Sequence, residues 1–175
     1  MDDEEQDSTR DGLTGLWKRD YFLQLANDLE EELRVSGGRS GVILVDVDNF
    51  KKINDEMGMM IGDAVLIEVA ARLSRVGQKD DIITRIGGDE FVLLLPKQDS
   101  ELKVKEASHA ILHEFQVPIE CNGHVLDVKV RVGAVISRPT ESFRETLDRA
   151  DDAQFQAKAG GGARANGFGS EWTSE

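Results

Sequence analysis

The stretch DIITRIGGDEFVLLLP, residues 81–96, decides which fold we expect. Two runs, 81–86 and 89–95, are rich in apolar residues and flank the glycine pair at 87–88. Apolar runs of strand length that are separated by two glycines are typical of a β-hairpin. Pro96 ends the second run, since proline cannot donate a hydrogen bond to a strand ladder. The stretch therefore predicts two antiparallel strands.

Apolar periodicity predicts the elements on either side of this hairpin. We expect helices where apolar residues recur at helical spacing, and strands in short runs that are rich in β-branched residues. The expected helices cover about 22–37, 66–77, 104–115 and 143–157, the expected strands are 41–47, 117–121 and 125–136, and regular structure should end at glycines 160–162. Alternating helices and strands with two hairpins predict a mixed α/β sandwich, in which helices cover a central sheet.

Length and charge limit the number of domains and the class of partner. The 175 residues fit one compact domain. A net charge of −13 argues against binding of duplex nucleic acid, which requires clustered Lys and Arg. Seven of the acids lie in the two ends, and residues 8–165 retain a net charge of only −6. We expect residues 1–10 to be a flexible acidic leader and 166–175 a solvated tail.

No feature of the sequence requires export or a membrane. The single cysteine, Cys121, cannot form an internal disulfide. No apolar run approaches the roughly 18 residues that a membrane-spanning helix needs. The acidic amino terminus is unlike a secretory signal. We expect a cytoplasmic protein without a membrane segment.

Carboxylates lie near the ends of two predicted strands. Asp46 and Asp48 fall on one face of the strand at 41–47, because side chains alternate along a strand. Asp89 and Glu90 begin a strand that is able to pair beside it, so that three or four carboxylates would converge. Hard divalent cations such as Mg²⁺ prefer oxygen ligands and commonly bridge carboxylates to phosphates. The alternative is that these acids only cap turns or face solvent.

Other nucleotide and metal motifs do not match. An EF-hand loop that began at Asp46 would need an oxygen ligand and a glycine where the chain has Phe50 and Lys51. Neither a Gly-x-x-x-x-Gly-Lys-Ser/Thr loop nor a Gly-x-Gly-x-x-Gly motif occurs. Cys121 and the three histidines fit no zinc-ligand spacing. An acidic cation site is the hypothesis that these exclusions leave.

Several separated motifs occur in an order that is hard to produce by chance. They are DGLTGL at 11–16, DVDNFKKIND at 46–55, Gly62-Asp63, GGDEF at 87–91, and, near the far end, Arg149-Ala150-Asp151 with Ala157-Lys158. Together they resemble the GGDEF domain, the diguanylate cyclase family, over roughly residues 11–165.

The resemblance implies a fold and a reaction. The fold is a cyclase-like palm, with a mostly antiparallel sheet of about five strands flanked by helices. The reaction condenses two GTP molecules into cyclic di-GMP and releases two pyrophosphates. Each 3′-hydroxyl attacks the α-phosphate of the other GTP, so the resemblance implies a two-fold homodimer. It also implies two Mg²⁺ or Mn²⁺ ions per half-site and control by an upstream sensor domain, which these residues do not contain.

The functional residues of the family carry over by position. The resemblance implies that Asp63 reads guanine, since a carboxylate accepts from the guanine N1 and N2 donors; adenine has no such pair, which argues against a mixed cyclic dinucleotide. The implied metal ligands are Asp46, the Val47 carbonyl, Asp89 and Glu90; the implied catalytic residues are Glu90 and Asp89; and the implied substrate-binding residues are Asn54, Asp63, Phe50, Lys51, Gly87, Gly88 and Lys158.

The chain departs from the family at several positions. In the product-inhibition site, an Arg-x-x-Asp in the family, Asp81 is present but Gln78 stands at the Arg position. Loss of a bidentate guanidinium predicts weak or absent inhibition, unless Arg75 compensates in part. Three further positions differ from the family: Met59 stands in place of a His, Lys18 in place of an Asn, and Gly162 in place of an Arg. Arg164 lies two residues beyond Gly162 and is a candidate substitute for that Arg. These departures predict a higher Michaelis constant.

A second hypothesis is a catalytically silent domain that binds GTP or regulates a partner. Degenerate relatives lose the signature acids, whereas Asp46, Asp89 and Glu90 are all present in this chain. A buried acid cluster without a function is costly. The acids therefore favour an active cyclase.

Overall fold

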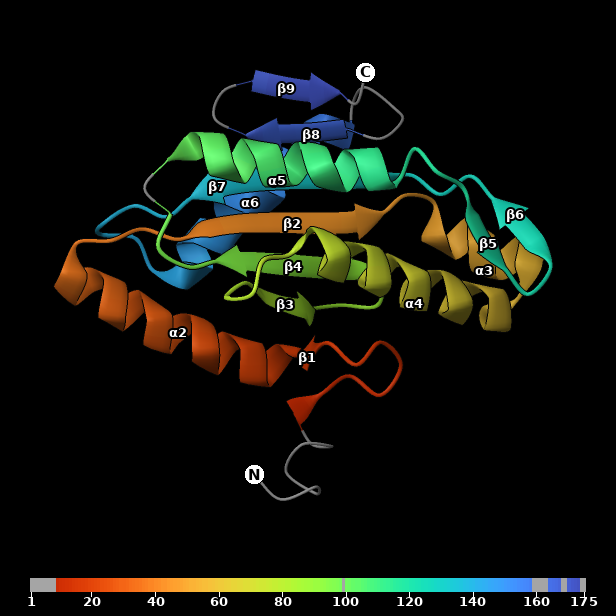
Figure 1. Cartoon of the computed structure of the whole chain (residues 1–175), viewed down its shortest axis with the longest axis horizontal. Coiled ribbons are helices and arrows are strands. Elements are labelled where there is room, and N and C mark those ends of the chain that lie inside the picture. The colour runs from red at the N-terminus through yellow and green to blue at the C-terminus, as the bar shows by residue number, and fades with distance from the viewer. Residues whose placement is uncertain (1–8, 99, 159–163, 168–169, 174–175) are drawn as a thin grey trace.

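The structure is a computed structural model that describes residues 9–98, 100–158, 164–167 and 170–173, with side chains through Ala157. Figure 1 shows helices on both sides of a sheet. The elements in chain order are β1 (Trp17–Lys18), α2 (Arg19–Ser36), β2 (Gly41–Val47), α3 (Phe50–Met57), α4 (Met59–Val76), β3 (Ile82–Arg85), β4 (Glu90–Leu95), α5 (Glu101–Glu114), β5 (Ile119–Cys121), β6 (His124–Leu126), β7 (Val130–Ile136), α6 (Phe143–Lys158), β8 (Arg164–Gly167) and β9 (Ser170–Thr173).

The main sheet has the strand order β1-β3-β4-β2-β7-β8-β9 within the described ranges. Its central strands β3, β4, β2 and β7 pair with one another in antiparallel fashion. Strands β1 and β8 add in parallel, and β9 is antiparallel to β8. The predicted mixed α/β fold with a mostly antiparallel sheet is confirmed, and the short edge strands make the sheet wider than the five strands expected.

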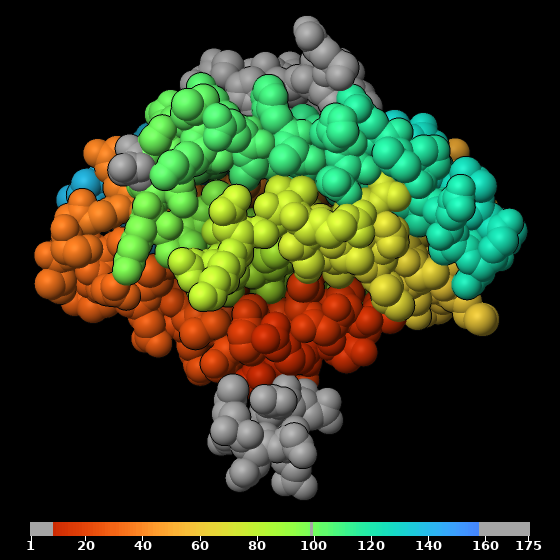
Figure 2. All heavy atoms as spheres, in the orientation of Figure 1, coloured from red at the N-terminus to blue at the C-terminus, as the bar shows by residue number. Residues whose placement is uncertain are grey.

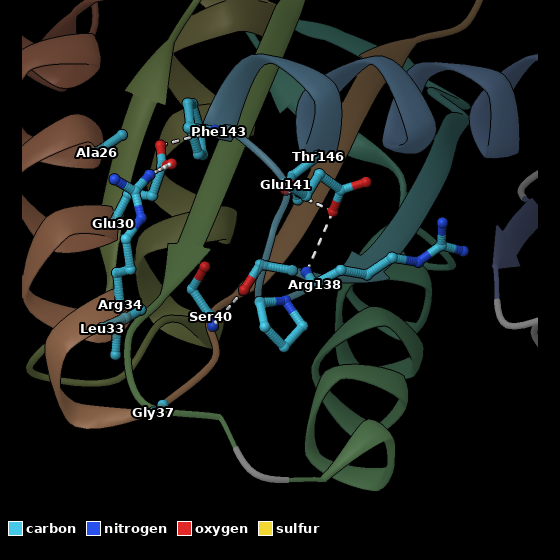
Figure 3. Close-up of a pocket in the computed structure, with 13 residues that line it drawn as sticks. Ala26, Glu30, Leu33, Arg34, Gly37, Ser40, Arg138, Glu141, Phe143 and Thr146 are labelled. Atoms are coloured by element: carbon cyan, nitrogen blue, oxygen red, sulfur yellow. Dashed lines mark hydrogen bonds and ion pairs between the residues drawn. The ribbon is translucent and has the colours of Figure 1, made fainter.

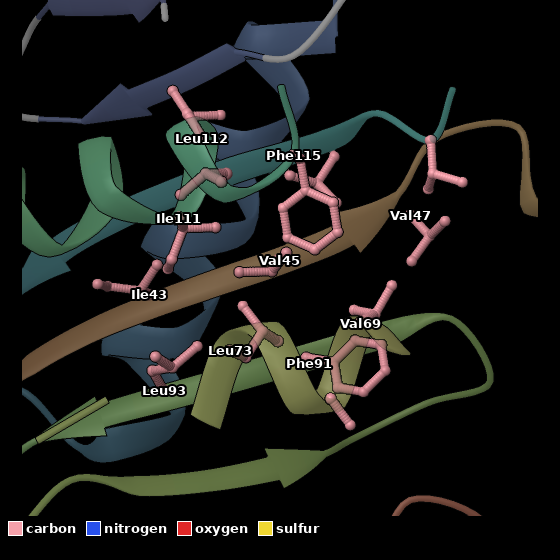
Figure 4. Close-up of a cluster of buried hydrophobic side chains, with 14 of the residues drawn as sticks. Ile43, Val45, Val47, Val69, Leu73, Phe91, Leu93, Ile111, Leu112 and Phe115 are labelled. Atoms are coloured by element: carbon pink, nitrogen blue, oxygen red, sulfur yellow. The ribbon is translucent and has the colours of Figure 1, made fainter. Parts of the chain in front are cut away.

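Strand β2 is buried on both faces. Ile43 and Val45 point toward α4 and α5, where the core in Figure 4 includes Leu73 and Phe115. Leu44 belongs to a second cluster on the opposite face, which side chains of α2 and α6 complete. In the space-filling view, α4 and α5 lie over the near face of the sheet (Figure 2). The apolar run at 41–47 is therefore a central strand, as its composition predicted.

The predicted hairpin forms, but its turn is longer than the glycine pair alone. Strands β3 and β4 pair up to Arg85 opposite Phe91, and residues 86–89 connect the end of β3 to the start of β4. Gly87 and Gly88 are not among the residues with positive φ in the described chain. The glycines are therefore not needed for a tight primed turn at this position.

Apolar periodicity predicted no helix between residues 48 and 65, and this was wrong. That stretch contains α3 and the first turns of α4, which Gly58 separates with a φ of 87°. Phe50, Ile53 and Met57 of α3 recur at helical spacing and pack against the core. Eight residues give only two turns of periodic signal, which explains why the sequence did not show α3.

The strand expected at 125–136 is two strands. Strand β6 pairs with β5 in a small separate sheet, and β7 pairs with β2 in the main sheet. Residues 127–129 break the ladder while the chain passes from one sheet to the other. Val128 is buried in this segment, so the apolar pattern continues through the break.

The expected end of regular structure at glycines 160–162 was also wrong. Strand β8 pairs with β7, and β9 pairs with β8, beyond that point. The glycines themselves lie outside the described residues, as do residues 1–8 of the expected leader. Within the described ranges, no helix is both long enough and apolar enough to cross a membrane.

Candidate functional site

Three charged residues stand side by side on neighbouring strands. Asp46 of β2 is in register with Glu90 of β4 on one side and with Arg131 of β7 on the other. Residues directly opposite in antiparallel strands point to the same face. Asp46 shares its face with Leu44, which packs on the side of α2 and α6. The prediction that the strand after Asp89 pairs beside the Asp46 strand is confirmed.

A glycine brings helix α6 close to this row. A Cβ on Gly133 of β7 would overlap backbone atoms of α6, so no larger residue fits without a shift of the helix. Asp151 and Phe155 of α6 consequently line a small cavity together with Asp46 and Arg131.

The acids of the row repel one another, and burial adds to the effect. Burial first, and then the negative charge of Asp89, raises the pKa of Asp46 to about 6, while Arg131 opposes the shift. Burial also raises the pKa of Glu90, with the charges of Asp89 and Asp151 as further causes. The guanidinium groups of Arg131, beside Asp46, and of Arg19, near Glu90, therefore do not outweigh burial and the neighbouring carboxylates, and both pKa values stay raised.

The sequence did not identify Arg131 as part of this site. Its Nη2 lies 3.0 Å from Asp46 Oδ2 and 3.4 Å from Asp48 Oδ1. Its side chain is only 12% exposed. The available signal was the single base within the apolar run VRVGAVI, residues 130–136, because a charge on a buried strand needs a partner.

The oxygen ligands in this corner suit a hard divalent cation, although they do not form a cage. Asp46 and Glu90 contribute carboxylates, and the backbone N–H of Val47 donates to the Asp89 carbonyl at 3.1 Å, which holds these two predicted ligands in the same corner. In the part of the chain that the structure describes, no three His, Cys, Asp or Glu side chains converge closely enough to hold a metal ion. Mg²⁺ usually completes its shell with water and substrate phosphates. The carboxylates therefore provide some of the ligands that such a cation needs. They lie in a row across neighbouring strands and do not converge on one point as we expected.

Arg85 and Asp11 support the loop that precedes β4. The Arg85 Nε donates to the Gly88 carbonyl at 2.9 Å, and its guanidinium pairs with Asp11 at 3.3 Å. The Asp11 carboxylate also accepts from the backbone N–H and the hydroxyl of Thr14. A Cβ on Gly88 would meet no atom within 4 Å, so the loop borders open space there. The opening motif of the chain thus holds the hairpin loop in place.

Asn54 and Asp63 lie on two consecutive helices that meet at a glycine. Asn54 is in α3, and its amide oxygen occupies the place that a Cβ on Gly62 of α4 would take. Asp63 follows Gly62 directly. The fold therefore brings the two predicted guanine-reading positions into one region.

The start of α3 offers backbone donors. Its N-cap residue, Asn49, has a φ of 54° and makes no side-chain cap. N–H groups in the first turn of a helix have no partner within the helix and attract anions. Phe50 packs on the core while Lys51 is exposed, so Phe50 anchors the segment and the backbone beside Lys51 is near solvent. Phosphate binding by this backbone stays a prediction.

Gln78 and Asp81 lie together in the turn between α4 and β3. The Asp81 carboxylate accepts from the Gln78 backbone N–H at 2.7 Å. Arg75 pairs instead with Glu114 at 3.0 Å and with Glu68 at 3.7 Å. These pairs argue against the idea that Arg75 replaces the missing arginine.

A second cavity lies at the amino-terminal end of α6, away from the acidic row (Figure 3). Glu30 there accepts from the Phe143 backbone N–H at 2.8 Å and pairs with Arg34 at 2.9 Å. Glu141 accepts from the Arg138 backbone N–H at 3.1 Å. These acids are already satisfied by the protein, which makes the cavity a poorer candidate than the acidic row.

The structure does not describe the side chains of the predicted substrate-binding residue Lys158 and of the departures beyond it. The side chains of Lys158 and Arg164, and the whole of Gly162, lie outside the described residues.

The Cys121 thiol has a pKa raised by burial and by the charge of Glu68, which does not suit a nucleophile.

The comparisons with known proteins decide the family. The family described as "Diguanylate cyclase, GGDEF domain" matches residues 8–164. The chain belongs to the GGDEF family. The resemblance seen in the sequence motifs is therefore confirmed.

Relatives and solved structures agree with this assignment. The diguanylate cyclase DgcN of Escherichia coli is 36% identical over 85% of this chain and 36% of its own length. The GGDEF domain of DgcB from Caulobacter crescentus, solved with c-di-GMP, superposes with a TM-score of 0.85 at 28% identity over 94% of this chain and 95% of that one. Diguanylate cyclase SiaD of Pseudomonas aeruginosa, solved with its activator SiaC, has a TM-score of 0.84 at 31% identity, over 91% and 61%. The chain spans only part of the length of these curated relatives, from 18% to 42%.

Proposed function

We propose that this GGDEF domain condenses two GTP molecules into cyclic di-GMP and releases two pyrophosphates. The observation that carries the proposal is the register of Asp46 beside Glu90, which places two signature acids of the family next to each other. The catalytically silent alternative is not favoured, because Asp46, Asp89 and Glu90 are all present and burying such acids without a function is costly.

The residues of the acidic row would orient the reacting groups. Asp46, Glu90 and the Val47 carbonyl would hold the divalent cations, which when bound lower the pKa of the attacking hydroxyl and offset charge at the α-phosphorus. Asp89 or Glu90 would accept the proton of the 3′-hydroxyl.

The nucleotide would extend from the acidic row to the α3–α4 pair. The first-turn amides of α3 would bind the terminal phosphates, and Asn54 and Asp63 would read the guanine. The open space at Gly88 supports close approach of the nucleotide to the hairpin loop. Because each GTP must react with the other, two such domains would meet face to face.

Incubation of the purified protein with GTP and Mg²⁺, followed by chromatography for cyclic di-GMP, tests this proposal. Glu90→Gln should lower the rate by about 100-fold or more, because it removes a charge from the reacting centre. The exposed Glu120→Gln, on strand β5, is the matched control and should keep the wild-type rate. The absence of product from the wild type at high protein concentration would contradict the proposal.

A further inference from the structure

We propose that Arg131 is a resident counter-ion that keeps divalent cations out of the acidic row until a nucleotide arrives, so that cation and GTP enter together. The inference rests on the proposed function, because it concerns how the same site is filled. It assigns a role to a residue that neither the motifs nor the predicted ligand set contains.

The first argument is the position of the guanidinium. Its Nη2 contacts both Asp46 and Asp48, and one of these two is a predicted metal ligand. The register of β7 against β2 fixes the backbone of Arg131 directly opposite Asp46, and the side chain is nearly buried. A cation at Asp46 would therefore face a fixed positive charge at close range.

The second argument is that the protein alone offers a bare cation few ligands. No three ligating side chains converge within the described ranges, so water and phosphate must complete the shell. A triphosphate supplies oxygen ligands and, at the same time, negative charge that offsets the guanidinium. Arg131 repels a cation that arrives alone and tolerates one that arrives with phosphate.

The third argument is a donor of Arg131 that lacks an acceptor. Its Nε is buried and has no hydrogen-bond acceptor. Buried polar atoms are normally paired, and an unmade bond is costly. Because this donor is buried, a phosphate oxygen would reach it only if the guanidinium turned away from Asp46 and Asp48 toward the nucleotide, and the new hydrogen bond would stabilise that arrangement.

The expected size of the effect follows from Coulomb's law. A single charge about 5 Å from a divalent ion weakens binding on the order of tenfold even at the dielectric constant of water, and more in a partly buried site. Removal of the charge should therefore tighten the binding of a bare cation by about tenfold or more.

A titration of the protein with Mn²⁺ alone, followed by electron paramagnetic resonance of the unbound ion, tests this inference. Arg131→Gln should bind Mn²⁺ about tenfold or more tightly than the wild type. Arg131→Lys keeps the charge and should stay within a few-fold of the wild type. Arg149→Gln removes a guanidinium that pairs with the largely buried Glu141, and serves as the matched control with unchanged Mn²⁺ affinity. Equal affinity of Arg131→Gln and wild type would overturn the inference.

A measurement on the wild type alone covers the case in which Arg131→Gln does not fold. Mn²⁺ without nucleotide should leave the melting temperature nearly unchanged, whereas Mn²⁺ with GTP should raise it. An equal rise with Mn²⁺ alone would overturn the inference. Because the titration contains no nucleotide, failure of GTP turnover would contradict the proposed function without altering the Mn²⁺ result.

Discussion

At the scale of single residues, Asp46 is held between opposing influences. Burial and Asp89 disfavour its charged form, and Arg131 favours it, with a net rise of its pKa to about 6. Between about pH 4 and 6, the Asp46 carboxyl therefore keeps its proton in the folded domain, whereas in the unfolded chain it has released it. The contribution of Asp46 makes the free energy of unfolding fall as the pH rises through this window.

The variant Asp46→Asn should remove this pH dependence. We compare the free energies of unfolding of the variant and of the wild type, both without metal. The value for the variant minus the value for the wild type should increase by roughly 1–3 kcal/mol from pH 4 to pH 7. Urea denaturation in the presence of a chelator, repeated across this range, measures the difference. A difference between the two proteins that does not vary with pH would show that Asp46 titrates normally in the folded domain.

At the scale of elements, the contact between β7 and α6 shapes the site. Gly133 lets the backbone of α6 approach β7 more closely than any side chain would allow. The same contact places Asp151 and Phe155 over the acidic row. Packing of one helix on one strand thus controls the geometry of the predicted catalytic corner.

Substitution of Gly133 by Ala should destabilise the domain. Its Cβ would overlap backbone atoms of α6, which cannot rotate away as a side chain can, so the cost should be about 2 kcal/mol or more. Gly88→Ala is the matched control: its Cβ meets open space, and stability should change by less than about 0.5 kcal/mol. Urea denaturation compares the two. Equal stability of both variants would mean that α6 adjusts without cost.

At the scale of the whole molecule, the proposed reaction needs two copies of the domain. Each GTP is bound by one domain and attacked by the nucleotide of the other, so a solitary domain should be inactive. The rate per domain should therefore rise with protein concentration and level off once dimers predominate. Cyclic di-GMP formation along a dilution series, with sedimentation at the same concentrations, measures this. A constant rate per domain in a monomeric sample would contradict the dimer mechanism.

The sequence by itself determined the elements whose signal is local. The helix α2, the strand β2 and the β3–β4 hairpin follow from apolar periodicity within a few residues, and these were predicted correctly. The family followed from separated motifs, because their order and spacing are written in the chain. Asp46 and Glu90 were also expected as neighbours, since the acids stand near the ends of recognisable strands.

Tertiary contacts determined the features that no local pattern contains. Arg131 meets Asp46 across 85 positions of chain, because the register of β7 against β2 sets the pairing. Short elements such as α3 and β8 depend on packing and pairing with distant strands, and they carry too few residues for a periodic signal. The charge balance of the site belongs to this second group, since it depends on which side chains strand register and helix packing bring side by side.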